Sequence, residues 1–331
     1  MRLTPKRLLG WAQDYVASRT RDLNLLAVYL TGSLLTEEPL FGGLTDIDVV
    51  CIYNLEPPQT HEIRPLVRGV HLDVRHYPRD RFEPPRRLRH EAEMGSEVYY
   101  AQPLWDPQHF LDFVQSGVRS RFHSPDVAYA RAWAALNQAR QQWQQLLFAA
   151  DPNEPDTWLQ HLESLRQATL AIATLQGRRL TLRRFTLQWA TEAALLARED
   201  WFSALLRALG AHDGLAQTIM SLRDDWSRSL TLVAQAAPEH LHPARVPYYQ
   251  TGLDALLSNN PPEQALYLLW WTWSDAVRHP QAPEEARTRW LDAQTRLGLD
   301  AAWTSLLDAS DAFLDEVEQY LESWGRAQGV E

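Results

Sequence analysis

The 331-residue chain has almost no cysteine or lysine, with Cys51 its only cysteine and Lys6 its only lysine. A single cysteine excludes a disulfide scaffold and a thiolate zinc site, because both need several thiols. Acidic residues outnumber basic ones by 42 to 32, and the net charge is −10. Because affinity for nucleic acid depends on a positive field, this charge disfavours a broad nucleic-acid surface.

Long apolar runs are also missing from the sequence. The longest largely apolar stretch covers residues 265–273, well short of the roughly 20 residues that a membrane-spanning helix needs. The first residues show no positively charged stretch followed by an apolar one, so we expect no secretory leader. The sequence thus predicts a cytoplasmic protein with no membrane segment.

The pattern of apolar residues changes near residue 120. Before it, short β-type runs predict strands at 25–31, 47–53, 70–77 and 99–105, and helical patterns cover 8–17 and 86–97. We therefore predict an α+β fold, in which a small mixed β-sheet domain with helices on one face (1–118) precedes an all-α helical bundle domain (119–331).

The second half shows helical spacing throughout. Ser124-Pro125-Asp126 is a typical helix start, since it combines a capping hydroxyl, proline in the first turn and an acid at the positive end of the helix dipole. Glycine and proline then separate further predicted helices at about 157–176, 181–197, 199–209, 213–236, 244–258, 262–278, 282–297 and 300–325.

Three aspartates lie in predicted strands, where aspartate is unfavourable. Asp46 and Asp48 are two residues apart, so both carboxylates project from the same face of one strand. Asp73 lies in another strand and can approach this pair. Such a trio is unfavourable unless a cation lies between the charges, and oxygen ligands favour Mg²⁺ or Mn²⁺. His71 would share the face of Asp73, and we interpret it as structural.

Gly32-Ser33 follows the first predicted strand and precedes the aspartate pair by twelve residues. Glycine lets the backbone approach a phosphate closely. The Ser33 hydroxyl and the amides of the turn can donate hydrogen bonds to phosphate oxygens. The whole arrangement predicts a phosphoryl-transfer site with two metal ions.

This order of motifs resembles the DNA polymerase β-like nucleotidyltransferase superfamily. The similarity covers about residues 25–105, and it consists of Gly32-Ser33, then Asp46-Ile47-Asp48 between apolar residues, then Asp73 on a later strand. The resemblance implies that Asp46, Asp48 and Asp73 hold two Mg²⁺ ions, and that Gly32 and Ser33 hold the β- and γ-phosphates of a nucleoside triphosphate, ATP as co-substrate.

The layout is most similar to aminoglycoside nucleotidyltransferase-like proteins with a C-terminal helical domain. In such enzymes a glutamate activates the acceptor hydroxyl, and Glu93 and Glu97, four residues apart on one predicted helix face, are the candidates here, with Glu91 beside them. The resemblance implies transfer of AMP to a small hydroxyl-bearing acceptor, and the acidic helical domain suits a cationic one.

Two other features of the helical half can be interpreted in more than one way. Arg179 and Arg183 belong to a basic cluster that could reach the triphosphate, or could lie at solvated helix ends. The tryptophans at 270, 271 and 273 could stack on a base or sugar, but we predict that they belong to the core.

Two alternative functions remain open from the sequence. The chain could nucleotidylate another protein, as some antitoxin-type relatives do. It could also be a catalytically silent nucleotide-binding or interaction protein, although a self-repelling set of carboxylates has no physical reason to persist in one. The sequence makes no prediction of the oligomeric state.

Overall fold

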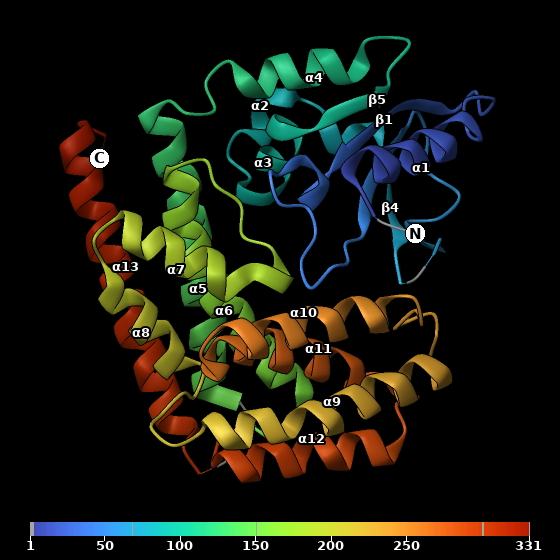
Figure 1. Ribbon diagram of the computed structural model, residues 1–331. Helices are drawn as coiled ribbons and strands as arrows, with labels where there is room; N and C mark the ends of the chain where they lie inside the picture. Colours follow the sequence, from blue (N-terminus) through green and yellow to red (C-terminus); the bar gives the residue numbers. More distant parts are fainter. Residues whose placement is uncertain (1–2, 68, 150, 300, 331) are drawn as a thin grey trace. The chain divides into compact units, whose positions relative to one another are not determined.

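The computed structural model of the chain describes residues 3–67, 69–149, 151–299 and 301–330 (Figure 1). The chain is a mixed α+β protein that divides into two compact units, Met1–Ala128 and Tyr129–Glu331. The first unit contains a five-stranded mixed sheet, and the second is built from helices.

The sheet has the order β3-β4-β2-β1-β5. Its strands are β1 (Leu25–Thr31), β2 (Ile47–Tyr53), β3 (His61–Pro65), β4 (His71–Pro78) and β5 (Gln102–Trp105). The central strands β2 and β4 are parallel, whereas β1 pairs antiparallel with β2 and β5, and β3 pairs antiparallel with β4. The parallel pair is important for the site, because it places residues of β2 and β4 side by side in register.

Helices cover both faces of this sheet, so the prediction of helices on one face was wrong. The helical elements of the first unit are α1 (Pro5–Ala17), η1 (Gly32–Leu35), η2 (Arg79–Phe82), α2 (Pro85–Leu88), α3 (Ala92–Tyr100) and α4 (Phe110–Arg119). Leu8 and Ala12 of α1 pack with Val28 and Val49 on one face. Helices α2, α3 and α4 pack on the other (Figure 1). Every residue of β1 is buried, which requires an apolar cover on both sides.

Three local predictions differ from the structure of the first unit. The strand predicted at 99–105 begins only at Gln102, because α3 continues to Tyr100. The helix predicted at 86–97 is two helices, α2 and α3. The sequence reading missed β3 and α4; β3 is a mostly polar edge strand, so its residues lack the apolar run that marks a buried strand.

The second unit follows the predicted helices closely. Its helices are α5 (Pro125–Ala149), which starts in the first unit, α6 (Pro155–Leu175), η3 (Leu182–Arg184), α7 (Phe185–Leu195), α8 (Glu199–Ala208), α9 (Ala216–Ala236), α10 (Arg245–Asn259), η4 (Pro262–Ala265), α11 (Leu266–Val277), α12 (Glu284–Leu297) and α13 (Trp303–Gln328). The residues described in 129–331 contain no strand. Residue 300, the first of the predicted 300–325 helix, lies outside the described residues.

Tryptophans form much of the core of this unit. Trp270 is fully buried and stacks on Trp158 at 5.1 Å between ring centroids, and on Trp273 at 6.2 Å. Trp271, which lies between the two core tryptophans in the sequence, is only half-buried. The expectation of a core stripe thus holds for Trp270 and Trp273, and Trp271 differs because it lies on another side of α11.

Candidate functional site

The site begins with four polar side chains on one face of the parallel pair β2 and β4. Asp48 is the register partner of Asp73, and Ile47 is the partner of Leu72. Asp46 precedes β2 directly and His71 opens β4. Because alternate residues of a strand share a face, Asp46 and Asp48 project to the same side as His71 and Asp73.

Three of these four side chains can hold one metal ion. Asp46, His71 and Asp73 each offer a ligand atom, and these atoms lie within 4.8 Å of one another. The three residues are 8%, 0% and 7% exposed, respectively. Carboxylates are rarely buried unless they are paired or bind a metal, so their burial within ligand distance of one another fits a cation site.

The fourth residue, Asp48, lies against the Gly-Ser turn. Gly32 has φ +75°, and a Cβ atom on it would lie 1.7 Å from Asp48 Oδ2. Thr31, the last residue of β1, is the register partner of Asp48, which explains why the turn and the carboxylate meet. Only glycine fits here, since any side chain would displace the carboxylate and strain the backbone.

A hydroxyl pair joins the two segments of the motif. The Oγ atoms of Ser33 and Thr45 are 2.7 Å apart, and the Thr45 hydroxyl also donates to the carbonyl oxygen of Asp46 at 3.1 Å. The Gly32-Ser33 turn is therefore fixed to the residue that precedes the aspartate pair. Sequence reasoning missed Thr45, although its position directly before Asp46 was a usable signal.

His61 of β3 adds a nitrogen to the edge of the site. Its Nε2 lies 2.7 Å from Asp73 Oδ1, while its side chain remains 41% exposed. Residues that orient metal-binding carboxylates commonly form hydrogen bonds of this kind. Sequence reasoning could not find His61, because it did not predict the strand that carries it.

The two glutamates predicted to share a helix face lie in different environments of α3. Glu93 is exposed in the first turn, whereas Glu97 is buried. The Glu97 carboxylate accepts hydrogen bonds from Tyr29 Oη at 2.8 Å and from Arg75 Nη2 at 2.6 Å. Glu91, the third glutamate considered, pairs with Arg81.

Arg75 links Glu97 to the aspartates. It lies two residues after Asp73 on the same face of β4. Burial lowers the pKa of its guanidinium, but the carboxylates of Glu97 and then Asp48 outweigh burial and raise that pKa above its ordinary value. Burial, followed by the neighbouring Glu97 charge, raises the pKa of Tyr29. Arg75 therefore stays charged beside Asp48, and its two-residue spacing from Asp73 could have identified it.

The two arginines of the predicted nucleotide site belong to the second unit. Arg183 of η3 is buried, and its guanidinium lies 3.9 Å from the centroid of the Tyr248 ring, with Thr251 Oγ1 3.4 Å from its Nη2. Arg179 is half-buried. Within this unit Arg183 thus packs on α10 through a cation–π contact.

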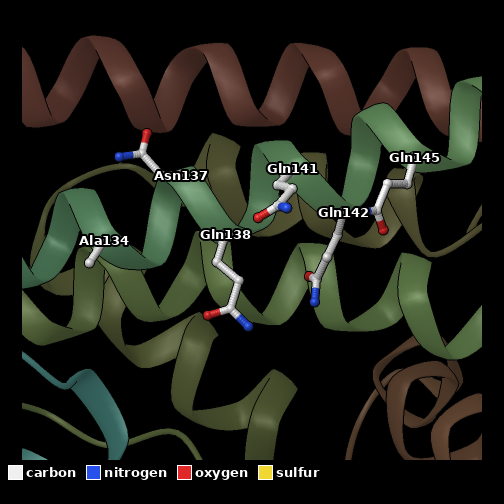
Figure 2. A pocket seen from close by; sticks show the side chains of 6 residues that line it. All are labelled: Ala134, Asn137, Gln138, Gln141, Gln142 and Gln145. Carbon is white, nitrogen blue, oxygen red and sulfur yellow. The ribbon is translucent and has the colours of Figure 1, made fainter.

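The second unit also carries an amide-rich hollow that the sequence analysis did not single out. Five amide side chains of α5, labelled in Figure 2, line a hollow of about 540 Å³ together with Ala134: Asn137, Gln138, Gln141, Gln142 and Gln145. Their steps of three and four residues, which place them on one side of the helix, were the available signal. A neighbouring hollow of about 410 Å³ shares Gln142 and Gln145 and adds Trp271, three acids and an arginine: Asp156, Glu163, Asp275 and Arg278, the last of which pairs with Asp156 and Asp275.

Comparisons with known proteins leave the interpretation to this geometry. The chain matches no known protein family, and no curated protein matches it in sequence. Among the described helices, none combines the length and apolarity that crossing a membrane would require.

Proposed function

We propose that the chain is a metal-dependent nucleotidyltransferase that transfers a nucleoside monophosphate, AMP from ATP, to a hydroxyl of a small acceptor. Residues 1–118 would form the nucleotidyltransferase catalytic domain, and 119–331 the helical domain that binds the acceptor. The observation that carries this proposal is the contact between Gly32 and Asp48, because it joins the phosphate-binding turn to a carboxylate that is in register with Asp73.

The donor set fits the divalent cations that this reaction uses. Asp46, Asp48 and Asp73 supply carboxylate oxygens from one face of two adjacent strands, which is the ligand type that Mg²⁺ and Mn²⁺ prefer. Two such ions, when bound, would neutralise phosphate charge and steady the attacking and leaving oxygens. Arg75 lies beside the carboxylates and adds a positive charge on the same face.

The Gly32-Ser33 turn and the two glutamates of α3 have separate roles in this proposal. The Gly32-Ser33 turn would hold the β- and γ-phosphates. Glu93, exposed on α3, would take the proton of the acceptor hydroxyl. The hydroxyl oxygen would attack the α-phosphorus of ATP, and the bond from that phosphorus to the pyrophosphate oxygen would break. Glu97 would instead position Arg75, because its carboxylate accepts hydrogen bonds from Tyr29 Oη and Arg75 Nη2, which hold it in the fold.

The composition of the second unit supports a polar acceptor. The hollow of about 410 Å³ combines amides and the exposed part of Trp271 with Arg278, which pairs with Asp156 and Asp275, and with Glu163, which pairs with Arg166. Amides bind hydroxyls, and an indole packs on an apolar sugar face. This composition favours a polar, hydroxyl-bearing molecule, and the acidic net charge of the helical domain suits a cationic one such as an aminoglycoside.

The test is transfer with a matched pair of variants. The wild-type chain is incubated with Mg²⁺-ATP, or with Mn²⁺-ATP, and a panel of aminoglycosides, and mass spectrometry detects acceptors heavier by one AMP. Asp48→Asn should lower transfer at least about a hundredfold, because it removes a metal ligand. Asp80→Asn makes the same chemical change at an exposed position and should leave transfer unchanged.

Circular dichroism keeps this test separate from misfolding. Asp48→Asn should unfold at nearly the wild-type temperature, because relief of the repulsion among the aspartates offsets the lost attraction between Asp48 and Arg75. Undiminished transfer by Asp48→Asn would refute the metal role. If the chain itself gained AMP and no small acceptor did, the result would favour a protein over a small molecule as the acceptor.

A further inference from the structure

One member of the candidate metal-binding group is a histidine, His71, whose ring nitrogen lies beside the carboxylates of Asp46 and Asp73. His71 is fully buried at the start of β4, and its ring offers a ligand atom within 4.8 Å of those of Asp46 and Asp73. The register of the parallel strands produces this arrangement: Ile47 pairs with Leu72, so residue 71 lies beside residue 46. The position of the imidazole is therefore set by the sheet.

The chemistry of imidazole distinguishes between cations. Mg²⁺ is a hard ion that takes oxygen ligands and keeps much of its water. Mn²⁺ also takes carboxylates, and although it is the weakest of the first-row transition metals in its affinity for nitrogen ligands, as a d-block ion it binds an imidazole nitrogen more readily than Mg²⁺ does. A site with two carboxylates and one imidazole thus gains a ligand with Mn²⁺ that Mg²⁺ uses poorly.

We propose that His71 is a metal ligand and that it makes this site selective for Mn²⁺ over Mg²⁺. The inference concerns the site of the proposed nucleotidyltransferase and so rests on that function for its biological meaning. Binding of the ion itself is measured without nucleotide, which keeps the two proposals separable.

A second histidine supports the same assignment from outside the ligand group. His61 Nε2 lies 2.7 Å from Asp73 Oδ1, so it holds one oxygen of a carboxylate that faces His71. Hydrogen bonds from outside a metal site orient its ligands in this way. His61 and His71 therefore have different expected roles, the first as a positioning residue and the second as a ligand.

The chain offers a matched control on the same strand. His76 is also buried on β4, but the odd and even positions of a strand face opposite sides. Its ring lies on the face that packs with Tyr53, 5.7 Å away between ring centroids. Substitution of His76 changes a buried histidine without touching the face of Asp46 and Asp73.

The experiment measures Mn²⁺ and Mg²⁺ binding to the full chain. Free Mn²⁺ is followed by electron paramagnetic resonance, and Mg²⁺ affinity is obtained by competition. Wild type should bind Mn²⁺ about tenfold or more tightly than Mg²⁺. His71→Asn should lower Mn²⁺ affinity about tenfold or more while changing Mg²⁺ affinity about threefold at most. His76→Asn should keep the wild-type ratio of the two affinities.

A spectroscopic readout identifies the ligand directly. Electron spin-echo spectra of the Mn²⁺-loaded wild type should show modulation from a directly bound nitrogen, and His61→Gln should retain it. The modulation should disappear in His71→Asn. His71→Asp, which replaces the imidazole by a third carboxylate ligand, serves if the asparagine variant does not fold, and it should lose both the modulation and the Mn²⁺ preference.

Two outcomes would overturn the proposal. One is a wild-type spectrum without bound nitrogen, and the other is an unchanged ratio of Mn²⁺ to Mg²⁺ affinity in folded His71 variants. AMP transfer that persists beside either result would preserve the proposed function and remove this inference. Nitrogen-ligated Mn²⁺ without any AMP transfer would preserve this inference and remove the proposed function.

Discussion

Gly32 and Asp48 are in direct contact, and a methyl group on residue 32 would overlap the Asp48 carboxylate at 1.7 Å from Oδ2. The two residues are sixteen positions apart in the sequence, and the antiparallel pairing of Thr31 with Asp48 brings them together. The glycine of the turn is thus needed for the position of a candidate metal ligand, as well as for its own left-handed backbone.

This contact predicts the result of Gly32→Ala. The alanine should lower the free energy of unfolding by about 1–3 kcal/mol, because it combines a left-handed backbone with displacement of Asp48. AMP transfer should fall at least about a hundredfold, since a misplaced ligand disturbs the reacting geometry. Urea unfolding and the mass-spectrometric transfer assay measure the two effects.

Gly43→Ala is the matched control for that variant. Gly43 has a similar φ of +79°, but an added Cβ would meet nothing within 4 Å. Backbone strain should therefore lower the free energy of unfolding of Gly43→Ala by only about 1–2 kcal/mol, and the variant should keep full activity. Equal activities of the two alanine variants would show that the Asp48 carboxylate does not depend on Gly32.

The pattern of residues was enough to predict β2 and β4, which carry or directly follow the aspartates, and β1, which leads to the Gly32-Ser33 turn. The runs at 25–31 and 47–53 coincide with β1 and β2, and 70–77 is within one residue of β4. Period-two alternation also placed Asp46 and Asp48 on one face. These features are local, because they depend on which side chains a strand buries.

The neighbours of the aspartates could not be predicted in the same way. The approach of Asp73 to Asp48 depends on parallel pairing of β2 with β4, and β3, the edge strand that precedes β4, was not predicted. His71 was placed on the correct face and interpreted as structural, and its closeness to Asp46 depends on the parallel pairing of β2 with β4, which no local pattern shows. The partners of Glu97 come from β1 and β4, far away in the sequence.

The surroundings of Glu97 predict that its role is mainly structural. Glu97→Gln keeps the shape of the side chain but removes the charge that faces Arg75, and it places an amide nitrogen against one of two donors. The free energy of unfolding should fall by about 1–3 kcal/mol, as when one partner of a largely buried pair is lost. Chemical denaturation at neutral pH measures this change.

Glu93→Gln, on the same helix, separates structure from chemistry. Its side chain is exposed, so the free energy of unfolding should change by no more than about 0.5 kcal/mol. AMP transfer should nevertheless fall, by about a hundredfold or more, if Glu93 takes the proton of the acceptor. Full activity of Glu93→Gln would remove it from the reaction, and a stable Glu97→Gln would contradict the positioning role of that residue.

The stability of the helical unit should depend on pH through His161. Burial lowers the pKa of this histidine from 6.5 to about 4, and its hydrogen bond to the Ala208 carbonyl only partly offsets burial. The unfolded chain therefore binds a proton between pH 6.5 and 4 that the folded chain does not. The neutral, buried His161 therefore makes its full contribution to the free energy of unfolding above pH 6.5, and this contribution decreases as the pH falls toward 4.

A glutamine at this position isolates the effect. His161→Gln can still donate to the Ala208 carbonyl but has no proton to gain, so its stability should fall by about 2 kcal/mol less than that of wild type between pH 7 and pH 5. Tryptophan fluorescence during urea unfolding reports on this unit, since only Trp11 and Trp105 lie before residue 129. His212→Gln, at an exposed histidine, should keep the wild-type pH dependence. Parallel pH curves for His161→Gln and wild type would contradict the assignment of the titration to His161.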